Sequence, residues 1–140
     1  MNIRIKLAEG AKVPTKNSPD EAGYDLYSND DFLIKPMERK LIKTGIFIQI
    51  PYGYYGHISD RSGMALKKGA HCLGKIIDPT YRGEVGVIVL NTDMFDSIKV
   101  QKGDRIAQII FKKYENIDFV IESNLEESSR GALGFGSSGR

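Results

Sequence analysis

The sequence contains a single cysteine, Cys72, among 140 residues. One cysteine excludes an internal disulfide and a multi-cysteine zinc site, and it is compatible with a reducing compartment. Long apolar runs are also missing, so neither a membrane-spanning segment nor the hydrophobic core of a secretory signal is present. We therefore expect a soluble intracellular protein, located in the cytoplasm or the nucleus.

A charge excess of one sign is missing as well. The sequence has 20 Lys and Arg residues and 18 Asp and Glu residues, for a formal net charge of +2, and the two signs are interspersed along the chain. This pattern is not the electrostatic footprint of a protein that binds duplex nucleic acid or a membrane surface. A small anionic ligand is compatible with it.

No long amphipathic pattern with a period of 3.6 residues occurs, which disfavours a helical protein. Instead, 15 glycines and 5 prolines punctuate short segments rich in Ile, Val, Phe and Tyr. This composition is typical of many short strands in one domain. We expect an all-β fold, a jelly roll or distorted β-barrel, with one short helix.

Individual segments refine this expectation. Alternation of polar and apolar residues predicts half-buried strands over 2–7 and 46–50. Residues 85–90 and 106–111 are apolar on both faces, apart from Gln108, and are predicted to be central strands. The one helix is predicted over 64–68, with Ser62 as its N-cap and Gly69 as its end.

Two short segments carry residues suited to phosphate chemistry. Arg61-Ser62-Gly63 offers a guanidinium, a hydroxyl and free amide groups at the start of the predicted helix, which suits a phosphate; an ordinary helix N-cap is the alternative. Asp78 lies between an apolar run and a Pro/Gly turn, where we place it at the tip of a hairpin. It could orient a water molecule as a general base, or hydrogen-bond its own turn.

Other polar residues need a partner or a ligand. Gln108 lies where the strand pattern requires an apolar residue, so its amide should be hydrogen-bonded. Asp25 alternates with tyrosines and is either a structural acid or an acid beside a metal. His57 and His71 are isolated, and we interpret both as surface or core histidines rather than metal ligands.

The C-terminal segment 123–140 has five serines and four glycines and few apolar residues. A disordered linker is the usual interpretation of such a composition. Arg130, Phe135 and the hydroxyls of Ser137 and Ser138 instead suit a lid over a nucleoside triphosphate. We therefore divide the chain into a β-barrel core, 1–122, and a C-terminal arm, 123–140.

Taken in order, these segments resemble the five motifs of the trimeric dUTPase family over residues 13–140. The segments that carry the resemblance are Ala22 to Ser28, Arg61-Ser62-Gly63-Met64-Ala65, Ile77-Asp78 with Tyr81-Arg82-Gly83-Glu84, Gly103-Asp104-Arg105-Ile106-Ala107-Gln108, and the tail from Arg130. The resemblance implies a jelly-roll homotrimer with active sites shared between chains. It also implies hydrolysis of dUTP to dUMP and pyrophosphate, which keeps uracil out of DNA and supplies dUMP for dTMP synthesis.

The resemblance also implies roles for single residues. Asp78 would activate the water that attacks the α-phosphorus, and Asp25 would contact hydrated Mg²⁺ through water. Tyr81 would pack on the deoxyribose. The backbone hairpin over residues 73–81, with Leu73, Gly74 and Ile77, would recognise uracil. The phosphate ligands would be Arg61, Ser62, Gly63 and Gln108, and the arm, closing over the active site of a neighbouring subunit, would add Arg130, Phe135, Gly136, Ser137 and Ser138.

A few positions depart from the family pattern. Asp60 replaces the usual proline and adds a negative charge beside the phosphate site, where it could weaken binding. Lys75 replaces a glycine, and Pro79-Thr80 replaces a small or acidic pair, so the hairpin backbone could differ. The tail has Ala132-Leu133 and Ser138 where glycine or polar residues and a threonine are usual.

Three other functions are alternatives to dUTP hydrolysis. A dCTP deaminase shares the fold and an Ile-Asp-Pro segment, but requires a glutamate ten residues after the aspartate, where this chain has Ile88. A non-catalytic nucleotide-sensing or protein-binding module would not need Asp78, Gln108, Arg130 and Phe135 together. A nucleic-acid-binding barrel is disfavoured by the balanced charge.

Overall fold

A computed structural model describes residues 2–134, and strands dominate the part of the chain it describes. A single helix, α1 (Ser62–Lys68), lies between β6 and β7. The strands are β1 (Arg4–Leu7), β2 (Tyr24–Tyr27), β3 (Phe32–Ile34), β4 (Arg39–Lys43), β5 (Ile46–Gln49), β6 (Tyr54–Ser59), β7 (Ala70–Leu73), β8 (Ile76–Ile77), β9 (Gly86–Asn91), β10 (Ile98–Val100) and β11 (Arg105–Lys113).

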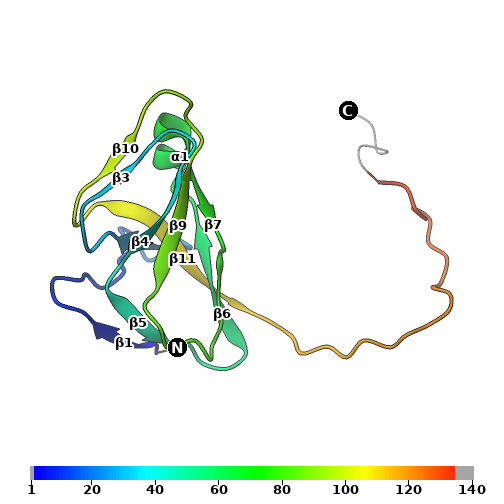
Figure 1. Cartoon of the computed structure of the whole chain (residues 1–140). Helices are drawn as coiled ribbons and strands as arrows, with labels where there is room; N and C mark the ends of the chain where they lie inside the picture. The colour runs from blue at the N-terminus through cyan, green and yellow to red at the C-terminus, as the bar shows by residue number, and fades with distance from the viewer. Residues whose placement is uncertain (1, 135–140) are drawn as a thin grey trace.

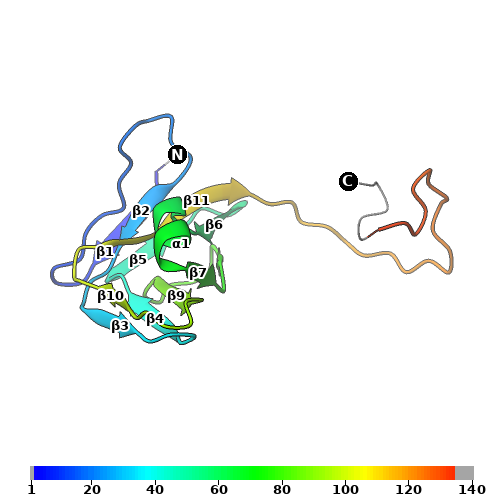
Figure 2. The same cartoon turned by 90° about the horizontal axis from the view of Figure 1, so that it is seen from above.

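The strands pair into four antiparallel sheets, of which two position the site (Figures 1 and 2). One has four strands in the order β2-β11-β6-β8, and another has three in the order β4-β9-β7. The pairs β1-β5 and β3-β10 complete the body. The predicted all-β fold with one short helix is confirmed, although the sheets do not close into a barrel within residues 2–134.

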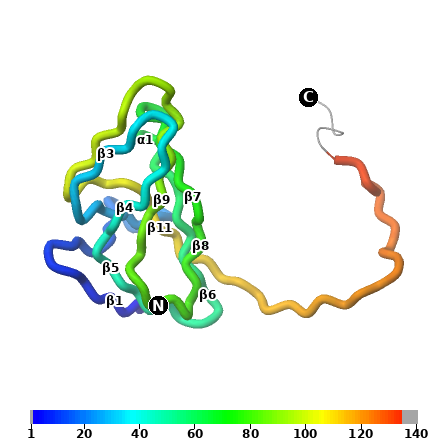
Figure 3. Tube along the Cα trace, in the orientation of Figure 1, coloured from blue at the N-terminus to red at the C-terminus, as the bar shows by residue number. Residues whose placement is uncertain are grey.

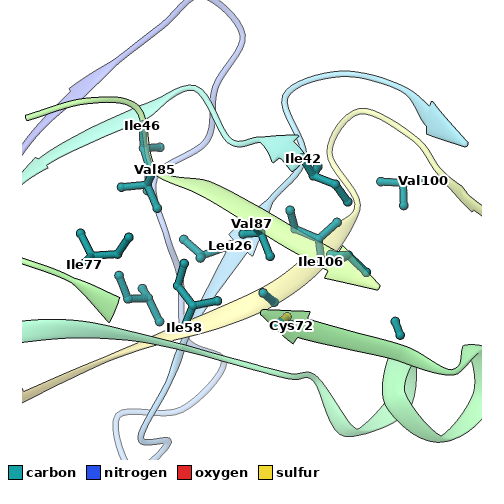
Figure 4. Close-up of a cluster of buried hydrophobic side chains, with 14 of the residues drawn as sticks. Leu26, Ile42, Ile46, Ile58, Cys72, Ile77, Val85, Val87, Val100 and Ile106 are labelled. Atoms are coloured by element: carbon teal, nitrogen blue, oxygen red, sulfur yellow. The ribbon is translucent and has the colours of Figure 1, made fainter. Parts of the chain in front are cut away.

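The hydrophobic core lies between these sheets and draws side chains from most of the strands (Figure 4). Alternation along the strands explains it: Val87 and Val89 of β9 are buried, as are Ile58 of β6 and Ile109 of β11. Burying one such side chain contributes roughly 1.5–3 kcal/mol. The opposite face of β6 and β11 is therefore free to carry polar residues.

The predicted central strands are confirmed, because β9 lies between β4 and β7 and β11 lies between β2 and β6. The strand over 46–50 is confirmed too, with Ile46 and Ile48 buried. The strand at the N-terminus is confirmed, but its predicted half burial is wrong. All four residues of β1 are exposed, and within residues 2–134 β1 pairs only with β5, in a sheet of two strands.

The N-cap of helix α1 lies one residue earlier than expected. Arg61 has the extended backbone of an N-cap (φ −92°, ψ 124°), so Ser62 is already helical, and the prediction of Ser62 as N-cap is wrong. The helix ends as predicted at Gly69, whose φ of 63° glycine adopts without strain. None of the residues of α1 is buried, and no described helix is long and apolar enough to span a membrane.

After β11 the chain leaves the body as an extended segment (Figures 1 and 3). Its departure follows the hydrogen bond from Tyr114 N to Gly53 O, 3.1 Å. Residues 115–134 contain no helix or strand. Several of their apolar side chains are exposed, including Phe119 at 88% and Ile121 at 98%. The described part of the chain therefore leaves these apolar side chains unburied.

Candidate active site

The face of the four-stranded sheet that points away from the core carries a row of polar residues. Asp25 of β2 lies opposite Gln108 of β11, and Gln108 lies opposite Ser59 of β6. Residues directly opposite each other share one face of a sheet. Because Ile58 and Ile109 point into the core, this row lies on the outer face.

Asp25 is the centre of a charged cluster on that face. Its Oδ1 accepts a hydrogen bond from Arg61 Nε at 3.0 Å, and its Oδ2 lies 3.3 Å from Arg105 Nε. Only 13% of the Asp25 side chain is exposed. Arg61 also donates from Nη1 to Arg105 O at 3.4 Å. Two guanidiniums and one carboxylate leave a net positive charge, which favours an anion.

Arg105 stays cationic in this cluster. A hydrogen bond that the Arg105 guanidinium donates to the Tyr27 oxygen raises the pKa of Arg105 most, and the charge of Asp25 raises it further. The motif 103–108 contains Arg105, but sequence reasoning did not assign it to the site. The available signal was its position at the start of the predicted strand that carries Gln108. We call Asp25, Arg61, Arg105 and Gln108 the arginine cluster.

Gln108 has the partner that its position in the strand pattern required. Its Nε2 donates to Asp60 O at 2.8 Å. On the other side it lies against Gly23, where a Cβ would meet Gln108 Oε1 at 2.2 Å. A residue larger than glycine at position 23 would therefore displace the amide of Gln108.

The first turn of α1 lies beside the arginine cluster. Ser62 and Gly63 are exposed, and no atom lies within 4 Å of the place where a Cβ on Gly63 would project. The amides of a first helical turn have no partner inside the helix. The segment 61–63 thus presents a guanidinium, a hydroxyl and free amides to open space, as an anion site requires.

The carboxylate of Asp60, by contrast, is already occupied. Its Oδ1 accepts from Cys72 N at 2.6 Å and its Oδ2 pairs with His71 Nδ1 at 2.8 Å. Burial raises the pKa of Asp60, but the hydrogen bonds from Cys72 and His71 and the charge of Lys75 together leave it below its ordinary value. The expected negative charge at position 60 therefore faces β7, and His71 is not isolated.

Asp78 directly follows β8 at the edge of the same sheet. Tyr81 N donates to Asp78 O at 3.1 Å, so the backbone of Asp78 closes the turn. The Asp78 side chain is exposed and accepts no hydrogen bond from the residues described. The alternative of a side chain bonded to its own turn is not found. The predicted hairpin with Asp78 at its tip is also wrong, because β8 and β9, the strands on either side of Asp78, belong to different sheets, as do β7 and β8.

Two cavities meet at Asp78. One of about 390 Å³ is lined by Ile77, Tyr81 and Ile88 among others, and one of about 430 Å³ by Tyr55 and Tyr114 among others. Each is large enough for a small ligand. We call Ile77, Asp78 and Tyr81 the Asp78 edge.

The ring of Tyr81 is held at the mouth of the smaller of these cavities. Its hydroxyl donates to Glu84 O at 2.9 Å. The ring covers Gly83, where a Cβ would lie 2.4 Å from the Tyr81 hydroxyl. Leu73 and Gly74 precede β8, with Leu73 half-buried on β7 opposite Ile88.

The arginine cluster and the Asp78 edge do not meet within one chain. Gln108 lies opposite Ser59, while Ile77 lies opposite Gly56, so Asp78 is level with Tyr55. From Ser59 to Tyr55 the strand advances about 13 Å, and the two strand spacings from β11 to β8 add about 10 Å. One phosphate group cannot contact both regions of the same chain.

The predicted arm residues lie apart from both regions. Arg130 is exposed, and its Nε donates to Leu133 O at 2.8 Å within a local turn. Phe135, Gly136, Ser137 and Ser138 lie outside the described residues.

The acidic residues fit a metal ion only in a limited way. Within residues 2–134 no group of three or more His, Cys, Asp or Glu side chains could hold one. Asp25 has both oxygens on arginines but keeps one lone pair on each. It can therefore accept a hydrogen bond from the water of a hydrated cation whose other ligands come from a bound anion.

Comparison with known proteins shows the family of the chain. A family model described as dUTPase matches residues 9–139. The deoxyuridine 5'-triphosphate nucleotidohydrolase of Yaba monkey tumor virus is 45% identical over 134 residues, 96% of this chain and 93% of the relative. The Mus musculus enzyme of the same name is 42% identical over 136 residues, 97% and 83% of the two chains.

A solved structure is also similar. The dUTPase of Staphylococcus bacteriophage 80alpha with dUpNHpp superposes with a TM-score of 0.92 at 29% sequence identity, and the match covers 99% of each chain.

Proposed function

The chain belongs to the dUTPase family, and on that premise we propose how its residues hydrolyse dUTP. The protein is a dUTP diphosphatase, which converts dUTP and water into dUMP and pyrophosphate. A relative of the same fold holds dUpNHpp, an analogue of this substrate. We also propose a soluble intracellular location, where a DNA precursor is available.

Asp78 is the general base in this proposal. Its free, exposed carboxylate accepts a hydrogen bond from a water molecule and takes its proton as the water oxygen bonds to the α-phosphorus. The bond from the α-phosphorus to the bridging oxygen breaks, and pyrophosphate leaves. No covalent intermediate with a side chain is needed, because positioning and charge neutralisation supply most of the catalysis of phosphoryl transfer.

Arg61, Ser62, Gly63 and Gln108 bind the phosphate oxygens. The net positive arginine cluster and the free amides of α1 support this role, since both attract an anion. Mg²⁺ carried by the triphosphate would neutralise phosphate charge and contact Asp25 through water. Asp25 itself orients both guanidiniums, so it would position the phosphate ligands even where it does not touch the ion.

The smaller cavity at the Asp78 edge receives the nucleoside. Backbone groups from Leu73 and Gly74 to Ile77 recognise uracil, and the Tyr81 ring, fixed by Glu84 O, packs on the deoxyribose. A ring in contact with the sugar has no room for a 2′-hydroxyl, which excludes UTP. Deamination of dCTP finds no support, because Ile88 lines this cavity and has no proton to transfer.

The distance between the arginine cluster and the Asp78 edge supports the proposal that different chains share each active site. Phosphate ligands and general base must act on one triphosphate, yet they lie far apart in a single chain. A homotrimer resolves this: one chain contributes the arginine cluster, a second contributes the Asp78 edge, and a third contributes the arm 123–140. The core would then comprise residues 1–122. The exposed apolar residues after β11 support a segment that lies against another chain.

Pyrophosphate release from each deoxynucleoside triphosphate and from UTP, with Mg²⁺ present, tests the function. Among the deoxynucleoside triphosphates we expect release from dUTP alone, and release from UTP should be at least about tenfold slower because of Tyr81. Release from several nucleotides would contradict the assigned base pocket. No release from a folded, assembled protein would contradict the proposed function as a whole.

A further inference from the structure

Asp60 joins two sheets at the point where the chain enters α1. Its carboxylate contacts β7 of the three-stranded sheet, through Cys72 N at 2.6 Å and His71 Nδ1 at 2.8 Å. Its carbonyl oxygen accepts from Gln108 Nε2 of the four-stranded sheet at 2.8 Å. One residue thus links β7, β11 and the segment that follows it.

The two contacts of the Asp60 carboxylate are of the stronger kind. The carboxylate is ionised at neutral pH, since its pKa is lowered, and a hydrogen bond to an ionised acceptor is roughly twice as strong as a neutral one. The Asp60 side chain is 26% exposed, so water screens its contacts only in part. The link is therefore able to restrain the backbone on both sides of it.

The neighbours of Asp60 are the proposed phosphate ligands. Arg61 is attached to the four-stranded sheet through Asp25 and Arg105 O, and Gln108 is attached to Asp60 itself. The first turn of α1 has no side-chain cap, so its N-terminus lacks this local restraint. Asp60 connects that end of the helix to β7.

We propose that Asp60 is a positioning residue of the active site, which holds Gln108, Arg61 and the first turn of α1 in register for the phosphates without contacting the substrate. This inference rests on the proposed function, in which Arg61, Ser62, Gly63 and Gln108 bind the phosphates. Asp60 then strengthens phosphate binding, although its charge is negative, because both oxygens are turned to β7.

The test compares Asp60→Ala with Asp60→Asn in the full-length protein. The alanine removes the carboxylate contacts, whereas the Asn amide oxygen can still accept from Cys72 N. The readouts are the Kd of dUpNHpp, the Kd of dUMP, KM and kcat for dUTP, and the Tm. Asp93→Ala is the matched control, since Asp93 also accepts two backbone amides, from Phe95 and Asp96, in a loop outside the proposed site.

We expect Asp60→Ala to weaken dUpNHpp binding about tenfold, with a matching rise in KM, as the loss of charge-assisted contacts allows. Binding of dUMP, which lacks the outer phosphates, should weaken less. Asp60→Asn should restore affinity to within about threefold, because one hydrogen bond remains. Asp93→Ala should change the Tm alone.

If Asp60→Ala does not fold, His71→Ala provides the second variant, because His71 is 46% exposed and only its contact with Asp60 is lost. It should raise the Kd of dUpNHpp about threefold. A lower Tm with unchanged Kd and KM in these variants would show that Asp60 is merely structural and would overturn the inference. Wild-type protein that neither binds dUpNHpp nor hydrolyses dUTP would instead overturn the proposed function.

Discussion

The arginine cluster and the Asp78 edge lie on one sheet but differ in how complete they are. In the arginine cluster every charged group has a partner in the same chain, and Asp25 is nearly buried. At the Asp78 edge the carboxylate is exposed and unpaired within residues 2–134, between two open cavities. The cluster is preorganised by its own chain, whereas the edge leaves its carboxylate free to bind another molecule.

This difference follows from local structure. Asp25 and Gln108 sit in the middle of paired strands, where neighbouring strands supply partners at fixed spacing. Asp78 follows a two-residue strand at the sheet edge and leads into a turn. Fixed charges suit a group that must hold phosphates, and a free carboxylate suits a group that must accept a proton.

The largest expected effect comes from a substitution in the Asp78 edge. Asp78→Asn should lower kcat by about 10³-fold, because the amide cannot accept a proton, within the range that general bases contribute. Binding of dUpNHpp and the Tm should hardly change, since the carboxylate has no partner to lose. Steady-state kinetics and calorimetry measure this, with Asp96→Asn as an exposed control. Retained turnover would remove Asp78 as the base.

Removal of the arm should have the next largest effect. A chain ending at Ser129 should lose roughly 10²-fold in kcat/KM, because closure over bound substrate supplies positioning and excludes water. Its Tm and oligomeric mass should match those of the full chain, because residues 115–134 contain no strand or helix. Kinetics and light scattering test both points. Full activity in the shortened chain would contradict a closing arm.

In the arginine cluster, a substitution should lower the free energy of unfolding. Asp25→Ala should lower the free energy of unfolding by about 2 kcal/mol, because it leaves two neighbouring guanidiniums without their carboxylate. Denaturant unfolding measures this. Asp118→Ala, at an exposed aspartate after β11, should cost less than about 0.5 kcal/mol. Equal effects of the two substitutions would show that the contacts of Asp25 in the arginine cluster do not stabilise the fold.

The smallest effect concerns acid stability. The pKa of Asp60 is lower in the folded protein than in the unfolded chain, so the ionised carboxylate stabilises the fold. This stabilisation is complete when the pH is above the pKa of the unfolded state, and it is lost as the pH falls through the pKa of the folded state. Wild-type protein should exceed Asp60→Asn by at most about 1 kcal/mol at pH 6, with His71 and Lys75 facing the carboxylate.

Thermal unfolding as a function of pH tests this: the difference should shrink below about pH 4. If the stability difference between wild-type protein and Asp60→Asn grew on acidification, the pKa of Asp60 would not be lowered in the folded protein.

The sequence predicted the parts of this account that depend on local pattern. Strand composition, the central strands and the end of α1 at Gly69 follow from periodicity and glycine chemistry, and the family follows from five ordered motifs. The role of Arg61 as N-cap in place of Ser62 was missed, because a one-residue shift of a helix start leaves no periodic signal. The exposure of β1 was missed because alternation does not reveal whether a second layer covers a strand.

Contacts between residues distant in the sequence could not be predicted either. The contacts of Asp60 with His71 and Cys72 depend on how the chain crosses between two sheets. The absence of a β7–β8 hairpin likewise reflects pairing with β9 and β6, strands distant in sequence. The arm residues from Phe135 onward stay predictions.

The claim that chains share each active site is tested most directly by mixing two inactive variants. Arg61→Ala and Asp78→Asn, refolded together in equal amounts, should recover activity at about a quarter of the sites, as random assembly of a cyclic trimer allows. Arg61→Ala mixed with Gln108→Ala should recover nothing, because both changes lie in the arginine cluster of one chain. Absence of recovery from the first mixture, in trimers shown to contain both variants, would contradict a site built from different chains.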